Sequence, residues 1–245
     1  MPNIKLTLEY NGSKFHGWQR HEGVRTIQAE LRRTIEIALR KSIPDPIASG
    51  RTDAGVHARA QVVNFKTDTV PDLERLRQAV SSIMRGELAV LSAEVVPDEF
   101  HARFSAKGKL YRYTIVNRVV PAVLDRGRAW FVAAELNIPK MQESASMLLG
   151  RHDFSCFQAS GCSSKDPIKI ITRSELSLHG SYLYYDVEAN GFLKQMVRNI
   201  VGTLVQIGRS ETRFMNLAEL IESKDRKLAG PTAPAHGLCL ERVFY

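Results

Sequence analysis

Apolar residues recur along the first hundred positions with two spacings, one typical of strands and the other of helices. In the segment 4–10 they alternate with polar residues, whereas in the segment 26–41 they recur every three or four positions. These spacings predict strands at 4–10, shortly before residue 49, at 61–66 and at 88–96, and helices at 26–41 and from Pro71 onward. The order strand, helix, strand, strand, helix, strand favours a mostly antiparallel sheet with helices on one side, an α+β layout.

The same two spacings continue along the rest of the chain. They predict strands at 109–116, 168–178, 182–188 and near the C-terminus, and helices at 137–149, 191–206 and 217–223. The two strands that flank His179-Gly180 are predicted to form a hairpin. Both parts of the chain share a rough plan of helices and strands, so we expect an N-terminal half, residues 1–105, and a C-terminal half, residues 106–245.

Capping and helix-breaking residues predict where the helices begin and end. Thr26 is a suitable N-cap for the first helix, which Pro44 and Pro46 are expected to end. Pro71 is expected to open the second helix, and Gly150 to stop the helix at 137–149. Asn190 is expected to cap the helix that ends at Gln206, whose apolar residues cover most of its circumference and predict burial.

Composition narrows the classes of protein that this chain can be. The chain has 245 residues, of which 44% are hydrophobic, and a formal net charge of +8, so it suits one large domain or two packed halves with an anionic partner such as nucleic acid. A merely soluble, positively charged enzyme is the alternative. The three cysteines form no Cys-x-x-Cys pair, which argues against a disulfide framework and a zinc site. No apolar run reaches membrane-spanning length, and we expect a cytoplasmic protein.

The stretch Ser49-Gly50-Arg51-Thr52-Asp53-Ala54-Gly55-Val56-His57-Ala58 is the leading candidate for chemistry. It places a carboxylate, Asp53, between two glycines that can adopt positive φ, on a tight loop between predicted strands. From local chemistry alone, an ordinary turn is the better explanation of these residues. Upstream, the aromatic segment at 15–20 either contacts RNA or uses Trp18 to cover the core.

Other polar residues support alternative interpretations. His152 and Asp153 lack further ligands at a spacing that suits a metal, so a hydrogen-bonded structural corner is the better interpretation. Arg198 lies at the edge of the polar strip of its helix, where a surface arginine with an extended side chain is the simplest explanation. Tyr111 shares a strand face with Tyr113 and Ile115, a spacing that is more typical of core residues.

Several motifs together resemble the TruA family of tRNA pseudouridine synthases over nearly the whole chain. The motifs are the ten residues around Asp53, Tyr-x-Tyr from Tyr111, Gly-x-His-Asp-Phe from Gly150, Phe-Leu-x-x-Met-Val-Arg-Asn-x-x-Gly from Phe192, and a closing Gly-Leu-x-Leu that contains Leu238. Asn11 departs from the aspartate that the family carries in its opening Tyr-Asp-Gly, which affects only a loop contact.

The resemblance implies a fold, an activity and a set of roles. It implies two α+β halves whose antiparallel sheets meet at a basic cleft, and a homodimer that isomerises uridines 38, 39 and 40 of the tRNA anticodon arm without metal or cofactor. Asp53 would be the catalytic residue, which in the family is proposed to attack C1′, to attack C6 or to remove the C2′ proton. Arg198 would pair with Asp53, Tyr111 would stack on the flipped uridine, and Leu238 would line its pocket. Arg51 would either hold a phosphate or brace the loop.

Two other functions compete with this one. A non-catalytic RNA-binding protein or RNA chaperone would suit the basic charge and the aromatic strands, but would have no need of Asp53. A hydrolase with paired carboxylates would need a second acid near Asp53, for which Asp153 is the candidate.

Overall fold

The structure, a computed structural model, describes residues 1–162, 164, 166–212 and 216–245. The chain forms two compact units, one of Met1–Lys107 with Cys239–Tyr245 and the other of Gly108–Leu238. The division after residue 105 that the sequence favours stays a prediction. The polar, glycine-containing sequence at 160–165 predicts a surface loop, and two of its positions, 163 and 165, lie outside the described residues.

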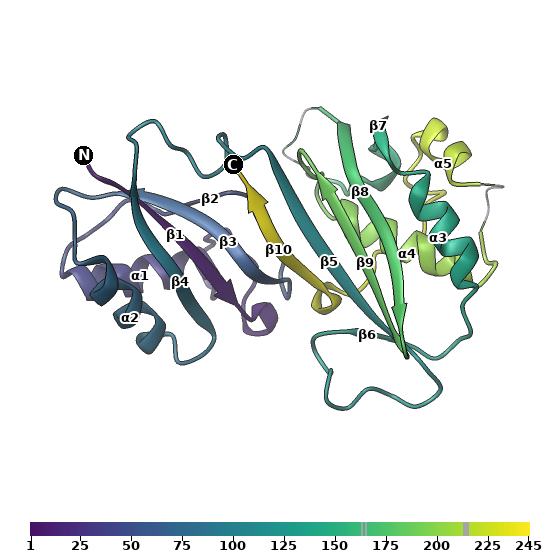
Figure 1. The fold of residues 1–245 in the computed structure, drawn as a ribbon, viewed down its shortest axis with the longest axis horizontal. Helices are drawn as coiled ribbons and strands as arrows, with labels where there is room; N and C mark the ends of the chain where they lie inside the picture. Colours follow the sequence, from purple (N-terminus) through teal and green to yellow (C-terminus); the bar gives the residue numbers. More distant parts are fainter. Residues whose placement is uncertain (163, 165, 213–215) are drawn as a thin grey trace. The chain divides into compact units, whose positions relative to one another are not determined.

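The first unit is built on a sheet whose central strands bury most of their residues. Its strands are β1 (Asn3–Tyr10), β2 (Ile47–Ala48), β3 (His57–Lys66), β4 (Leu88–Val96) and β10 (Leu238–Phe244). Strand β1 runs antiparallel between β3 and β4, β2 pairs antiparallel with β3, and β10 pairs parallel with β3 (Figure 1). The predicted order of elements and the predominance of antiparallel pairing are confirmed in this unit.

Two helices, α1 (Ile27–Leu39) and α2 (Leu73–Ile83), pack against each other over this sheet (Figure 1). Helix α1 buries Ile27, Leu31 and Ile35, which lie one above another because residues four apart share a helix face. The helical spacing in the sequence therefore identified the buried face correctly.

The ends of both helices differ from the predictions. Thr26 occupies the N-cap position of α1 but makes no capping bond, and its buried hydroxyl has no hydrogen-bond partner among the described residues. Helix α1 ends where Arg40 adopts a left-handed conformation, φ 54°, and thus before Pro44 is reached. Helix α2 begins after Asp72, whose carboxylate accepts a hydrogen bond from the Arg75 amide, and not at Pro71.

The second unit is also built mainly on antiparallel strands. Its strands are β5 (Gly108–Asn117), β6 (Trp130–Val132), β7 (Gly150–Asp153), β8 (Ile168–His179) and β9 (Tyr182–Ala189). The order is β5-β9-β8-β7 with antiparallel pairs, and β6 pairs parallel with β5 (Figure 1). The predicted hairpin of β8 and β9 is confirmed, and Gly180 supplies its positive φ of 60°.

The helices of the second unit are α3 (Ile138–Ser146), α4 (Met196–Gly208) and α5 (Leu217–Ser223). Helix α4 is buried almost throughout, as predicted, but it starts six residues later than Asn190. Gln195 adopts a left-handed conformation, φ 59°, which a continuous right-handed helix cannot contain. Asn190 instead accepts a hydrogen bond from the Ile170 amide. Helix α3 ends at Ser146, and Gly150 opens the next strand.

Three short 3₁₀ turns, Gly12–Lys14, Ser155–Phe157 and Ala235–Gly237, complete the secondary structure described. Of the helices in these residues, none has both the length and the apolar character needed to cross a membrane. Together the two units have the α+β class and the mostly antiparallel pairing that the sequence predicts.

The helix ends generate a matched stability test. Asp72→Ala removes a capping bond and is expected to lower the free energy of unfolding by about 1 kcal/mol. Thr26→Val replaces a buried hydroxyl with a methyl group of the same shape, and is expected to raise that free energy by about 1 kcal/mol. Urea denaturation measures both. A loss in both variants would show that Thr26 caps α1 after all.

Candidate active site

The loop that carries Asp53 connects β2 to β3 and has no secondary structure of its own. Asp53 is half-buried, and its carbonyl accepts a hydrogen bond from the Val56 amide at 3.2 Å. Gly55 makes the turn possible because it adopts φ 80°. Gly50 does not adopt positive φ, so only one of the two glycines uses the freedom that the sequence suggested.

The start of the loop is tied to strand β3. The Ser49 amide donates to the Val62 carbonyl at 2.8 Å, and the Ser49 hydroxyl donates to Gln61 at 2.7 Å. The Gln61 side-chain amide in turn donates to the Gly50 carbonyl at 2.8 Å. Ser49 and Gln61 are buried, so these bonds are shielded from water and hold the loop where it leaves the sheet.

The centre of the loop is held by the segment 12–18, mainly through backbone groups. The Trp18 amide donates to the Thr52 carbonyl at 3.0 Å, and the Gly55 amide donates to the Phe15 carbonyl at 3.3 Å. Gly17 lies so close that an added Cβ would stand 2.7 Å from the Thr52 carbonyl oxygen. Trp18 itself is buried, as expected if it covers the core, and contact of this aromatic segment with RNA stays a prediction.

Two side chains strengthen this attachment and were not identified from the sequence. The Tyr10 hydroxyl lies 2.9 Å from the Thr52 hydroxyl, and burial raises the pKa of Tyr10, so that it stays protonated. The His57 Nδ1 accepts a hydrogen bond from the Gly12 amide at 3.1 Å. Tyr10 was assigned only to a strand, and His57 only to the motif.

Arg51, two residues before the carboxylate, is exposed. The described bonds that brace the loop come from Ser49, Gln61, Thr52 and the segment 12–18. Of the two roles predicted for Arg51, contact with a phosphate therefore has more support than bracing the loop.

In the second unit, Tyr111 and Tyr113 lie on the same buried face of β5. The Tyr111 ring stands edge-on to Phe192, with centroids 5.1 Å apart, and this contact fixes the plane of the ring. Tyr113 donates its hydroxyl to the Pro234 carbonyl at 2.7 Å. Burial raises the pKa of Tyr113, and the positive charge of Arg198 opposes this rise.

Arg198 lies on α4 and turns toward the segment that precedes β10. Its Nε donates to the Ala233 carbonyl at 2.8 Å, and the Ala233 amide donates to the Arg198 carbonyl at 3.1 Å. Such a reciprocal pair holds the guanidinium in one direction. The interpretation of Arg198 as a surface arginine with an extended side chain is therefore wrong.

Leu238 is buried at the beginning of β10, directly after Gly237. An added Cβ on Gly237 would lie 2.6 Å from Cζ of Tyr113, so only a glycine lets the chain cross that ring. Tyr113 thus lies against Gly237, the residue before Leu238, and within the electrostatic influence of Arg198. Asp53 and Arg51 belong to the first unit, and the pairing of Arg198 with Asp53 stays a prediction.

His152 and Asp153 have structural partners. The His152 Nε2 lies 2.8 Å from the Leu149 carbonyl oxygen, and Asp153 accepts hydrogen bonds from the amide and the hydroxyl of Ser155. Asp153 also pairs with Lys224 at 3.2 Å. These contacts agree with the predicted structural corner. In the part of the chain that the structure describes, no three His, Cys, Asp or Glu side chains form a group that could hold a metal ion.

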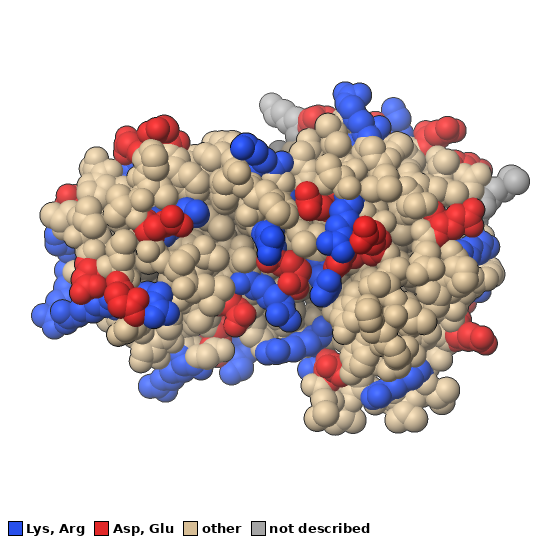
Figure 2. Space-filling view, in the orientation of Figure 1, with Lys and Arg blue, Asp and Glu red and all other residues tan. Residues whose placement is uncertain are grey.

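Charge is distributed in both signs over the surface. On the face shown in Figure 2, basic side chains are interspersed with acidic ones. Asp186, for example, pairs with Arg112 at 2.7 Å and with Arg173 at 3.2 Å. Such pairs neutralise part of the basic surface locally, and the net charge of +8 is the excess that remains after all acidic residues are counted.

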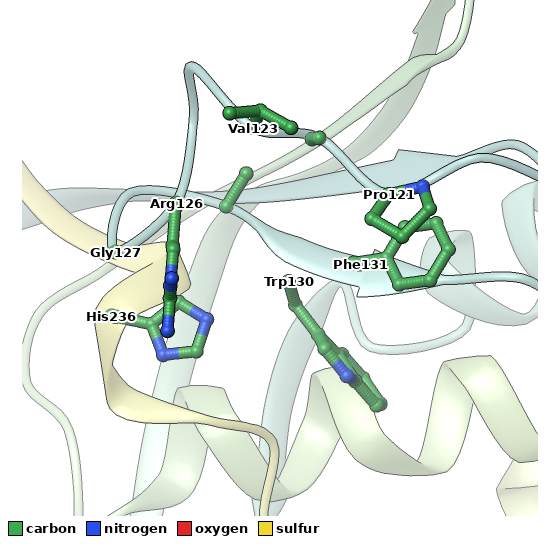
Figure 3. Close-up of a pocket in the computed structure, with 9 residues that line it drawn as sticks. Pro121, Val123, Arg126, Gly127, Trp130, Phe131 and His236 are labelled. Atoms are coloured by element: carbon green, nitrogen blue, oxygen red, sulfur yellow. The ribbon is translucent and has the colours of Figure 1, made fainter.

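A cavity of about 630 Å³ lies in the second unit, apart from the predicted site residues. Arg126 and His236 lie toward one side of it, and Pro121 and Phe131 toward the other, with Trp130 between them (Figure 3). None of the five predicted site residues lines this cavity. The size of a cavity alone therefore does not identify the candidate active site.

Comparison with known proteins defines the class of this enzyme. Residues 7–105 and 144–245 match the family model described as tRNA pseudouridine synthase. The chain belongs to the tRNA pseudouridine synthase family, whose chemistry is that of an isomerase.

Individual relatives match along the full chain. It is 41% identical over 245 residues to tRNA pseudouridine synthase A of Clostridium acetobutylicum, with all of both chains covered. It is 42% identical over 247 residues to the protein of that name from Moorella thermoacetica, again with full coverage of both. It is 42% identical over 243 residues to the one from Vibrio parahaemolyticus, which covers 99% of this chain and 91% of the relative.

The close approach of Gly17 to the Asp53 loop generates a second stability test. Gly17 and Gly23 both have positive φ, 84° and 75°, but nothing lies within 4 Å of a Cβ added to Gly23. Gly23→Ala is therefore expected to lower the free energy of unfolding only by the cost of placing an alanine at positive φ, about 1 kcal/mol. Gly17→Ala must also displace the Thr52 carbonyl, and is expected to lose about 3 kcal/mol in total.

Urea denaturation of the two variants measures the difference, and amide hydrogen exchange at Trp18 and Gly55 locates it. Faster exchange at both amides is expected in Gly17→Ala and not in Gly23→Ala. Equal losses of stability in the two variants would contradict a tight contact between Gly17 and the loop.

Proposed function

We propose that this chain isomerises uridine to pseudouridine at positions 38, 39 and 40 of the tRNA anticodon stem-loop, with Asp53 as the catalytic carboxylate. The observation that carries the proposal is the Asp53 loop itself, a half-buried acid on a turn that backbone bonds hold from both sides. Membership of the tRNA pseudouridine synthase family supports the substrate and the reaction.

The reaction breaks the N1–C1′ glycosidic bond, turns the base, and joins C5 to C1′; C5 then loses its proton, and N1 carries one in the product. No atom is oxidised and no water is added, so a positioned carboxylate beside the sugar or base is the main requirement. Asp53 must be ionised to act. An arginine partner favours the charged form of a carboxylate, and the fixed direction of Arg198 on the Ala233 carbonyl supports it in this role.

The target uridine must leave its stack, which costs a few kcal/mol. We assign Tyr111 to the flipped base, because its ring plane is fixed by Phe192 and stacking on a fixed ring offsets part of that cost. Leu238 supplies an apolar wall to the uridine pocket. Arg51, which is exposed, contacts a phosphate near the flipped nucleotide.

The remaining proposals concern partners and location. The chain works as a homodimer in the cytoplasm, and tRNA is its substrate. Lysine and arginine side chains hold the phosphate backbone of the tRNA, so the affinity for tRNA falls as the salt concentration rises.

Mapping of the product tests the proposed positions. Unmodified tRNA transcripts are incubated with the protein, treated with a carbodiimide that marks pseudouridine, and read by primer extension. Stops are expected at whichever of positions 38, 39 and 40 carry uridine, and at no other uridine. Matched transcripts with cytidine at all three positions serve as the control. Stops at other uridines would contradict the positions, and no stops would contradict the activity on tRNA.

A further inference from the structure

The segment Arg226–Pro234, here called the strap, lies directly against helix α4. Two glycines allow the close approach. A Cβ added to Gly202 would overlap the Pro231 carbonyl oxygen, and one added to Gly230 would lie 2.7 Å from the Thr203 backbone. The Gly230 amide donates to the Thr203 hydroxyl at 2.9 Å. The strap and the helix are therefore in backbone contact.

Arg226 joins the strap to the helix with its guanidinium. Its Nη1 donates to the Gly230 carbonyl at 2.9 Å and to the Ala229 carbonyl at 3.3 Å. Its Nη2 donates to the Asn199 side-chain oxygen at 2.9 Å and to the Thr232 hydroxyl at 3.3 Å. All four acceptors are neutral, and burial lowers the pKa of Arg226. The sequence places Arg226 in a basic patch with Lys224 and Lys227, but in the structure its donors are bonded within the second unit.

Asn199, the acceptor on the helix, is fully buried and follows Arg198 directly. Its amide nitrogen donates to the Phe157 carbonyl at 2.8 Å, while its oxygen also accepts the Thr232 hydroxyl at 2.7 Å. The polar atoms of its side chain are thus bonded in one orientation. Asn199 therefore offers Arg226 and the strap a fixed attachment point beside Arg198.

We propose that Arg226 is a positioning residue for the reaction, because it holds the strap so that the Ala233 carbonyl fixes the guanidinium of Arg198. The bonds run from Arg226 to Gly230 and Thr232, and the next residue, Ala233, accepts the Arg198 Nε–H at 2.8 Å. The rigid, planar guanidinium suits this task, because it reaches two carbonyls of the strap and the Asn199 side chain of the helix at once. A lysine presents a single point charge.

The inference rests on the proposed function of Arg198, and single-turnover kinetics test it. Arg226→Gln is expected to slow pseudouridine formation by about 10- to 100-fold, the cost of misplacing a reacting group from a distance. The tRNA dissociation constant and its salt dependence are expected to stay unchanged, because the Arg226 side chain donates its hydrogen bonds to groups within the protein. Lys227→Gln, which removes an exposed positive charge next in the chain, is the matched control and is expected to keep the wild-type rate.

A double-mutant cycle separates positioning from general stability. In an Arg198→Lys background, Arg226→Gln is expected to slow the reaction less than about threefold further, because the group that it positions is already gone. Arg226→Lys, which keeps the charge, supplies the same comparison if Arg226→Gln does not fold. An unchanged rate in the single variant, an equal loss in both backgrounds, or weaker tRNA binding with a smaller salt dependence would overturn the proposal.

A measurement without substrate distinguishes this proposal from the proposed function. NMR of protein labelled with ¹⁵N-arginine reports solvent exchange of the Arg198 Nε–H. Exchange is expected to be at least about tenfold faster in Arg226→Gln than in Lys227→Gln, because the bond to Ala233 opens more often. Equal exchange would overturn the positioning role. If the wild type forms no pseudouridine, the proposed function fails, and this exchange rate alone decides the role of Arg226.

Discussion

The close approach of the segment 12–18 to the Asp53 loop is the contact on which the first half of the proposed site depends. A loop without secondary structure keeps one conformation only if its backbone groups find partners. The Trp18 and Gly55 amides supply two such bonds, and Gly17 leaves the space that they require. The backbone on both sides of Asp53 is thus held in one conformation, and this conformation sets where the carboxylate leaves the loop.

The second unit uses the same kind of contact. The strap lies on helix α4 because Gly202 and Gly230 have no side chains, and Gly237 passes the ring of Tyr113 for the same reason. Bonds between backbone groups hold the loop of Asp53, and a backbone carbonyl accepts the hydrogen bond that directs Arg198. A carbonyl moves only with its chain, so this arrangement favours fixed directions of charge, which is what catalysis by positioning requires.

Hydrophobic spacing was sufficient to predict most elements of the fold but not their ends. Strand β4 was predicted with its exact bounds, Leu88–Val96. Helix α4 was predicted to start too early, because its apolar spacing extends back to Leu193 and no local signal marks the left-handed Gln195. Thr26 has the residue type of a cap but lacks the bond.

The residues of the candidate site likewise divide into those that sequence motifs indicate and those whose contacts only the folded structure shows. Asp53, Tyr111, Arg198 and Leu238 were found because they lie in motifs. The sequence shows Arg226 only as part of a basic patch, because its acceptors are carbonyls and side chains that folding brings to it.

The central claim is that Asp53 performs the chemistry. The most direct measurement is tritium release from tRNA transcripts that carry C5-labelled uridine, for the wild type and Asp53→Asn, with tRNA binding measured in parallel. The account predicts release by the wild type, no release by the variant, and equal binding by both. Release by Asp53→Asn at the wild-type rate would contradict it.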